Sequence, residues 1–155
     1  DVYKRQHENY IDRKSSAFVG LYENLVEDLD FEYSRPQENG YRTDVRWFRA
    51  LNENNIGFEI KGEPLISFSA HYNTIEDFDD GLRPNNPGEN VGTRKRIIKK
   101  QRKPIDVPKR DFISLNIDLK QMGVGGDNSW GARTLPKYTI NPGNYTYSFT
   151  ISPVN

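Results

Sequence analysis

Residues 123–131 have the side chains best suited to chemistry in this chain. They read GVGGDNSWG: glycines free the backbone, short polar side chains follow, and an indole comes near the end. The segment is superficially like a phosphate-binding glycine loop, but no Lys-Ser/Thr pair follows it and no helical pattern opens after it. An indole in such a loop either packs against its own domain or offers a flat apolar platform to a sugar ring. Local chemistry favours packing for Trp130 and leaves the platform open.

A basic segment is the second candidate. Residues 91–155 carry 12 basic and 4 acidic residues, whereas residues 1–90 carry 10 basic and 18 acidic ones. The basic residues concentrate in residues 81–110, where proline and glycine are frequent, so this segment is predicted to be an exposed basic loop or insertion. Nucleic-acid binding would favour interleaved aromatic side chains, and none lies between Phe78 and Phe112. A solvated loop that faces the acidic first half is the favoured interpretation, and no nucleic-acid partner is expected.

Other reactive residue types give no local site. His7 and His71 are the only histidines, they lie far apart in the sequence, and they are interpreted as surface or core-edge residues. The absence of cysteine excludes disulfides, thiolate metal ligands and a cysteine nucleophile. Carboxylates are plentiful, but a retaining glycosidase needs two of them about 5–5.5 Å apart, and the sequence does not give that distance. No residue of this chain is therefore assigned as catalytic or as a metal ligand.

The elements that must position these residues are predicted to be strands. Aromatic residues make up 12% of the chain, which also has 12 glycines and 9 prolines, a composition that leans towards β structure with many turns. Alternation, or β-branched and aromatic content, predicts strands at residues 41–48, 57–60, 65–70, 111–121, 138–140 and 145–151. Turns are predicted at residues 61–64 and 141–144.

Two further segments are less regular. Residues 15–30 are predicted to form a strand and then a helical turn, and Thr74 is predicted to cap a short helix with Asp77 at its third position. A length of 155 residues fits one domain, and the pieces favour an antiparallel β-sandwich. No apolar run reaches 18 residues, so no membrane partner is expected. The chain does not begin with Met, and we expect it to begin within a longer protein.

Four stretches, in order and at fitting spacing, carry a resemblance to a known family. The sequence resembles the last domain, called the small-chain domain, of bacterial β-galactosidases of glycoside hydrolase family 2. The resemblance covers nearly the whole chain. Its motifs are ENYIDR at residues 8–13, RPQENGYRTDVRW at residues 35–47, GVGGDNSW at residues 123–130 and YTYSF at residues 145–149.

The resemblance implies a fold and a division of labour between domains. The last domain of these enzymes is an all-β, antiparallel β-sandwich of the galactose-mutarotase-like supersandwich type, and residues 1–155 are expected to be the C-terminal part of one. In this family the two catalytic glutamates lie in a (β/α)₈ barrel that precedes this region, and the Mg²⁺ and Na⁺ ligands also lie elsewhere. This chain is therefore expected to hold no cofactor and to be inactive alone.

The resemblance also gives the glycine segment a role. In the family, the Trp of this loop lines the pocket where the leaving sugar or aglycone stacks, and the matching residue is Trp130. The residues that would support the indole as a positioning loop are Gly125, Gly126, Asp127, Asn128 and Ser129. The leading hypothesis is a C-terminal piece of a retaining β-galactosidase that hydrolyses terminal β-D-galactosides such as lactose.

The alternative is a non-catalytic carbohydrate-binding β-sandwich module with Trp130, Tyr41 or Trp47 as platforms. The expected partners are a β-galactoside and the preceding N-terminal and barrel domains of the same polypeptide. The chain departs from the family pattern at residues 1–6, and residues 81–110 are longer and more basic than expected. The sequence leaves open the substrate preference, whether the parent is a homo-oligomer, and whether it is cytoplasmic or periplasmic.

Overall fold

The described part of the chain contains six strands and four short 3₁₀-helices, joined by loops. The computed structural model describes residues 2–4, 7–34, 36–78, 103–126 and 131–155. In chain order the elements are β1 (Val2–Lys4), β2 (Leu21–Glu23), η1 (Val26–Leu29), β3 (Arg42–Leu51), β4 (Gly57–His71), η2 (Glu76–Phe78), η3 (Pro104–Asp106), β5 (Ser114–Asp118), η4 (Pro136–Tyr138) and β6 (Ser148–Val154). The predicted all-β class with antiparallel pairing is confirmed.

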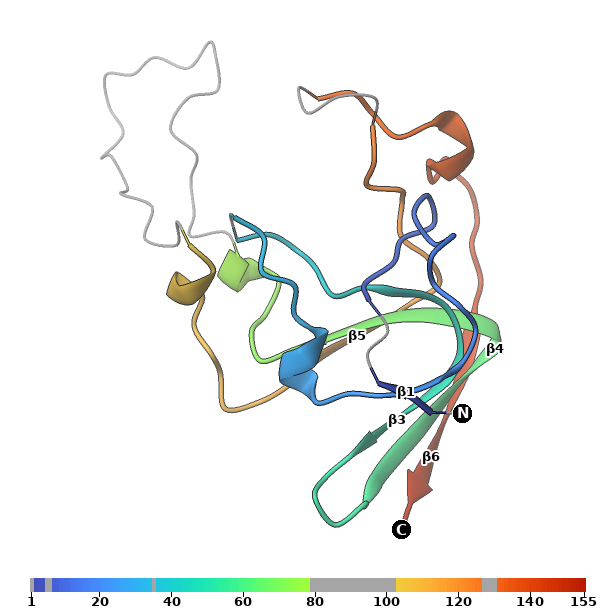
Figure 1. Ribbon diagram of the computed structural model, residues 1–155. Helices are drawn as coiled ribbons and strands as arrows, with labels where there is room; N and C mark the ends of the chain where they lie inside the picture. The colour runs from blue at the N-terminus through green and yellow to red at the C-terminus, as the bar shows by residue number, and fades with distance from the viewer. Residues whose placement is uncertain (1, 5–6, 35, 79–102, 127–130) are drawn as a thin grey trace.

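The long strand β4 is the centre of the main sheet (Figure 1). One edge of β4 pairs antiparallel with β3. On the other edge, residues 67–71 pair with β5 and residues 57–63 pair with β6. A separate two-stranded sheet pairs β1 with β2 in parallel. The two halves of β4 therefore have different neighbours, and only the first half runs beside the C-terminal strand.

The predicted turn at residues 61–64 is wrong, because β4 continues through it. The pairing with β3 jumps from Val45↔Ile66 to Trp47↔Lys61, so β4 contributes extra residues there. An extra stretch in one strand is a bulge, which bends the strand without reversing it. Proline cannot donate to a ladder and is tolerated at bulges, which explains why Pro64 lies inside a strand.

Other boundaries differ more modestly from the predictions. The predicted strand at residues 138–140 is wrong: the chain forms η4 instead, in which the Tyr138 amide donates to Leu135 O at 2.9 Å. Pro136 at its start has the backbone angle such a turn requires. The last strand begins at Ser148 rather than at residue 145. The strand and helical turn predicted within residues 15–30 are confirmed as β2 and η1.

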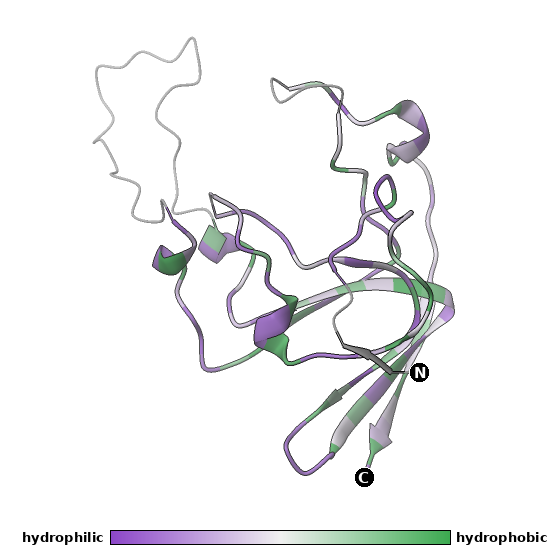
Figure 2. Ribbon diagram, viewed as in Figure 1, coloured by the Kyte–Doolittle hydropathy of each residue, from purple (hydrophilic) through white to green (hydrophobic). Residues whose placement is uncertain are grey.

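The buried core is small: it lies mainly along the second half of β4 and also includes Ile60 of the first half. Among the described residues, the buried apolar side chains are Tyr10, Tyr41, Ile60, Ile66 and Ala70. Buried polar side chains surround them, including Asn9, Arg42 and His71. Apolar residues also occur along the first half of β4 and its neighbours (Figure 2). Several of their side chains are exposed, among them Trp47, Phe58 and Ile151. None of the helices in the described ranges has the length and apolar character required to cross a bilayer.

Candidate functional site

The described part of the glycine segment is held against the N-terminal motif by one carboxylate. Asp12 Oδ1 accepts a hydrogen bond from the Val124 amide at 3.2 Å, and Asp12 Oδ2 accepts one from the Gly125 amide at 2.6 Å. The Gly123 amide donates to Tyr138 O at 2.9 Å. Three successive amides therefore have acceptors, and two of these bonds are of the stronger, charge-assisted kind.

The close approach of these groups accounts for glycine at two positions. A Cβ added to Gly125 would lie 2.8 Å from Asp12 Oδ2, and one added to Gly126 would lie 2.3 Å from Ala132 O. Both distances are shorter than a carbon–oxygen contact allows, so any side chain would push the segment away from its anchor. The glycines predicted to support the loop thus have a steric reason to be there.

The N-terminal motif that carries Asp12 is itself fixed to β3. The Asn9 amide donates to Tyr41 O at 2.8 Å, and the Asn9 side-chain oxygen accepts from the Thr43 amide at 2.9 Å. The Thr43 hydroxyl returns a bond to Asn9 O at 3.2 Å. Because Asn9 is only 2% exposed, these bonds form away from water and fix the register of the motif on the sheet.

An aromatic stack completes that attachment. The rings of Tyr10 and Tyr41 lie 5.8 Å apart and nearly parallel, at 9°. The guanidinium of Arg13 lies over the Tyr10 ring, 5.6 Å from its centre. Burial raises the pKa of both phenols well above the ordinary value. Both tyrosines are therefore neutral packing groups.

Glu8 joins the ENYIDR motif to the RPQENG motif. Its carboxylate accepts the Gly40 amide at 2.8 Å, the Tyr10 hydroxyl at 3.2 Å and the Tyr33 hydroxyl. Burial and then the Glu8 hydrogen bond raise the pKa of Tyr33. Asn39 continues the network, since its side-chain oxygen accepts the Phe31 amide at 2.9 Å. The two motifs are therefore one hydrogen-bonded unit.

His71 belongs to the same unit and is a buried structural residue. Its Nδ1 contacts Asp30 Oδ1, and its Nε2 lies 2.9 Å from Asn39 O. Only 3% of the residue is exposed. Both ring nitrogens are engaged inside the fold, so His71 is a buried residue rather than a surface one.

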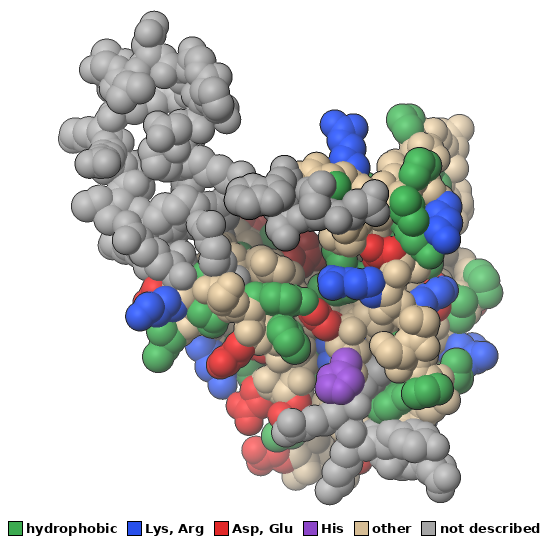
Figure 3. All heavy atoms as spheres, turned by 45° about the horizontal axis from the view of Figure 1, so that its top comes forward, with side chains coloured by type: hydrophobic (Ala, Val, Ile, Leu, Met, Phe, Trp, Pro, Cys, Tyr) green, Lys and Arg blue, Asp and Glu red, His purple; other side chains and the backbone are tan. Residues whose placement is uncertain are grey.

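A bidentate ion pair lies across the base of the basic segment. Arg110 Nε donates to Asp77 Oδ2 at 3.0 Å and Arg110 Nη2 to Asp77 Oδ1 at 2.5 Å, while the Thr74 amide donates to Asp77 Oδ2 at 2.9 Å. The Arg110 bonds and then the Thr74 amide lower the pKa of Asp77 to about 2. Lys109 Nζ lies 3.6 Å from Glu27. Acidic and basic side chains are also interspersed over the visible face (Figure 3).

These contacts bear on two predictions. The Thr74 amide bond to Asp77 is half of the predicted capping box and precedes η2. At Lys109 and Arg110, the basic segment does face the acidic first half of the chain. Residues 79–102, and with them most of the predicted loop at residues 81–110, lie outside the described residues.

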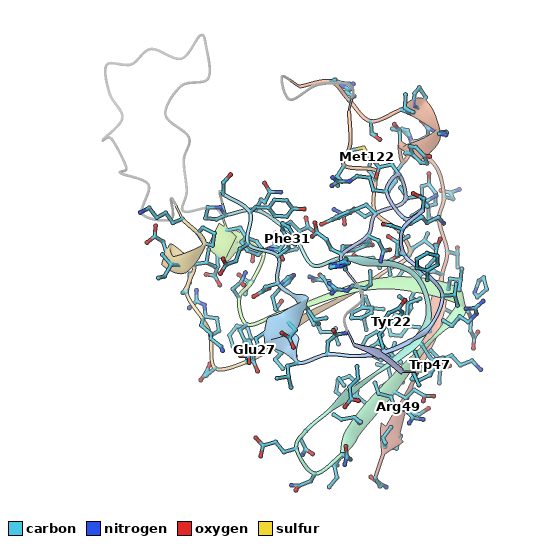
Figure 4. All side chains as sticks on the ribbon, viewed as in Figure 1. Tyr22, Glu27, Phe31, Trp47, Arg49 and Met122 are labelled. Carbon is cyan, nitrogen blue, oxygen red and sulfur yellow. The ribbon has the colours of Figure 1, made fainter. Side chains whose placement is uncertain are left out.

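A hollow of about 450 Å³ lies beside this ion pair. Its lining includes the carboxylates of Glu27, Asp30 and Glu32 and the rings of Phe31 and Tyr72; Figure 4 labels Glu27 and Phe31. Lys109 also lines the hollow: its Nζ lies 4.3 Å from the centre of the Tyr72 ring and 3.6 Å from Glu27. These side chains contact one another, and no role in the expected sugar chemistry is assigned to this hollow.

The predicted site residues divide into described and undescribed ones. Gly125 is bonded to Asp12, and Gly126 lies against Ala132. Trp130 lies outside the described residues, and so do the three preceding residues, Asp127, Asn128 and Ser129. The stacking role of Trp130 therefore stays a prediction.

The two other predicted platforms have different surroundings. Tyr41 is wrong as a platform, because it is 1% exposed and stacked on Tyr10. Trp47 is 40% exposed, but the Arg49 guanidinium lies 5.4 Å from its ring centre and covers part of one face. In Figure 4, Trp47 and Arg49 lie on the opposite side of the molecule from Met122, the residue before the glycine segment.

Asp12 and Glu8 are positioning groups that inspection of the sequence did not identify. Both lie in the ENYIDR motif, but a motif match does not say which amide a carboxylate will meet. The partners of Asp12 are 112 and 113 residues away in the chain. The available signal was chemical: an acidic residue in one motif and a run of exposed amides in another are natural partners.

The chain belongs to the Beta galactosidase small chain family, whose profile matches residues 5–151. It is 37% identical over 149 residues to a β-galactosidase of Priestia megaterium, an alignment that covers 96% of this chain and 12% of the relative. It is 32% identical over 135 residues to a β-galactosidase of Halalkalibacterium halodurans, covering 86% and 11%. A β-galactosidase of Vibrio cholerae is 30% identical over 146 residues, covering 94% and 12%. The chain thus spans about an eighth of the length of these relatives.

Each of these three relatives is named a β-galactosidase, and in each the match to this chain covers only a small part. Within the described residues, no group of three or more His, Cys, Asp or Glu side chains is arranged to hold a metal ion. The family resemblance assigns the Mg²⁺ and Na⁺ ligands to residues outside this chain, and that assignment stays a prediction. No step of the proposed function is assigned to either ion.

Proposed function

We propose that this chain is the C-terminal part of a retaining β-galactosidase and that its glycine segment presents Trp130 to the leaving sugar. The catalytic carboxylates would belong to the barrel of the same polypeptide, where one would form and release the galactosyl-enzyme intermediate. This chain alone would then be inactive. The observation that supports the proposal is the contact of Asp12 with the Val124 and Gly125 amides. It holds the residues that precede Trp130 in the sequence against the N-terminal motif.

A held loop is what a stacking platform requires. An aromatic contact with a sugar adds on the order of 1 kcal/mol only if the ring is already in place, because ordering a loose loop on binding costs free energy. Residues 123–126 are held at three successive amides, by Asp12 and by Tyr138. The indole four residues beyond Gly126 would therefore start from a fixed point.

The rest of the polypeptide is the proposed partner of an exposed sheet face. Register places Phe48, Ile60 and Ile151 on one face of the β3–β4–β6 ladder, with Phe58 two residues from Ile60 on the same face. Ile60 is buried, yet Phe58 and Ile151 are 37% and 59% exposed. An apolar face of this kind favours a covering layer, and the relatives, about eight times longer, have the chain to supply one.

The stacking role is tested by Trp130→Ala in the full-length enzyme. Loss of the indole should raise KM for lactose and weaken glucose binding as an acceptor by about tenfold, since one aromatic contact of 1–1.5 kcal/mol is removed. Formation of the galactosyl-enzyme from a substrate with a small leaving group should change little, because that step does not need the platform.

The matched control is Trp47→Ala, which removes the other tryptophan. Trp47 lies on β3, away from the glycine segment, so its loss should leave glucose affinity unchanged. Unchanged KM and unchanged acceptor affinity in Trp130→Ala would contradict the proposed role. An equal loss in both variants would assign the effect to general destabilisation.

A further inference from the structure

Asp12 lies where the first motif of the chain meets the glycine segment. Each of its two carboxylate oxygens accepts a different backbone amide, Oδ1 from Val124 and Oδ2 from Gly125. A carboxylate can accept at both oxygens, whereas the amide of asparagine has one oxygen and one donor group. The arrangement therefore requires Asp at position 12, and an Asn of the same size would set an N–H₂ against an N–H.

The turn that carries Asp12 is held in place by hydrogen bonds and by ring stacking. The Arg13 amide donates to Tyr10 O at 2.8 Å, which closes a turn around Asp12. Tyr10 is 4% exposed and stacked on Tyr41, the residue before β3. Asn9 is bonded to the first residues of the same strand. The Asp12 side chain therefore connects the glycine segment to the main sheet.

Position 125, on the other side of the contact, also tolerates few residue types. The Gly125 amide reaches Asp12 at 2.6 Å because no Cβ lies between them. A Cβ there would lie 2.8 Å from Asp12 Oδ2. Replacing either partner should break the same contact, so the two changes should not be additive.

We propose that Asp12 is a positioning residue of the leaving-group subsite: its carboxylate holds residues 123–126 and so sets where the following residues stand. This inference rests on the proposed function, in which Trp130 stacks on the leaving sugar. Asp12 touches no reacting atom in this scheme. It acts only through the segment that it anchors.

The test uses Asp12→Asn in the full-length enzyme, with Asp44→Asn as the matched control. Asp44 is an exposed residue paired with Lys14, so the control removes the same charge without touching the glycine segment. Hydrogen exchange of the peptide covering residues 123–126 should become about tenfold faster in Asp12→Asn, the size expected when a charge-assisted hydrogen bond is lost. Exchange in β4 should not change.

The second readout separates positioning from general stability. Glucose affinity as an acceptor should fall about as far in Asp12→Asn as in Trp130→Ala, while galactosyl-enzyme formation with a small leaving group is kept. Should Asp12→Asn fail to fold, Gly125→Ala tests the same contact from the other side, and the double variant should lose no more glucose affinity than either single one.

The outcomes distinguish this inference from the proposed function. Unchanged exchange at residues 123–126 overturns the inference whatever Trp130→Ala does. Faster exchange with wild-type glucose affinity, while Trp130→Ala loses affinity, also overturns it. If Trp130→Ala itself has no effect, the stacking proposal fails, and the exchange data alone decide whether Asp12 holds the segment.

Discussion

The two halves of β4 differ in how completely this chain buries them. In the second half, Ile66, Ser67 and Ser69 are almost fully buried between β3 and β5. In the first half, β4 runs between the end of β3 and β6. Ile60 is buried there too, but Phe58 and Ile151 on the same face are 37% and 59% exposed. The second half of β4 is therefore more completely buried than the first.

The difference shows which part of the domain is self-sufficient. The motif at residues 8–13 connects the start of β3 with residues 123–126 through the hydrogen bonds of Asn9 and Asp12. One face of the exposed half carries Phe58, Ile60 and Ile151. The other face mixes a charged pair, in which Arg49 Nε donates to Glu59 at 2.8 Å, with the exposed Trp47 and Leu51. The buried half can hold a site in place, and the exposed half is suited to contact with other domains.

The largest expected effect is at the buried half. Ile66→Ala should lower the free energy of unfolding by about 2–5 kcal/mol, because it leaves a cavity in a filled core. Urea unfolding of the chain, followed by circular dichroism, measures this. The control is Ile56→Ala, at a position 51% exposed, which should cost far less. Equal losses at the two positions would contradict the filled core around Ile66.

A smaller effect is expected at the exposed half, and only in the full-length enzyme. Ile151→Lys should lower the free energy of unfolding by about 1–3 kcal/mol, and with it the thermal midpoint, because a charge would enter the face proposed to be covered. Ser152→Lys lies on the other face of the sheet, opposite Glu59, and should be tolerated. In the isolated chain the two variants should be alike. A full-length enzyme indifferent to both would contradict the covering layer.

The smallest effect concerns the ion pair near the buried half. The folded pKa of Asp77 is about 2, below its ordinary value of 3.8. Its stabilising contribution is therefore complete above the ordinary value and is lost as the pH falls from about 4 towards 2. Urea midpoints at about pH 5 and about pH 2.5 should differ less in Asp77→Asn than in the wild type. Arg110→Gln should reduce this difference between the two midpoints as well. A difference as large as that of the wild type in both variants would contradict the role of this pair.

Local pattern predicted the strands well and their connections poorly. Period-two alternation located β5, and the aromatic run at residues 41–48 located most of β3. The turn at residues 61–64 failed because Gly and Pro mark bulges as well as turns, and only the partner strand decides between them. The strand at residues 138–140 failed because Pro136 began a 3₁₀ turn instead.

The site was predicted in its parts but not in its assembly. The glycine segment was recognisable from its residue types, and the ENYIDR motif from its resemblance to the family. The contact between them is long-range, and a single sequence does not encode which of its 22 acidic residues meets Gly125. Likewise, nothing in the spacing of residues 35–47 revealed that Tyr41 is buried and cannot serve as a platform.

The most direct test is a crystal structure of the full-length enzyme with glucose or lactose bound. We expect the Trp130 indole within ~4 Å of the leaving-sugar ring, a normal packing contact, and Asp12 still bonded to the Val124 and Gly125 amides. An indole packed against its own domain and away from the sugar, with the site otherwise occupied, would contradict the central claim.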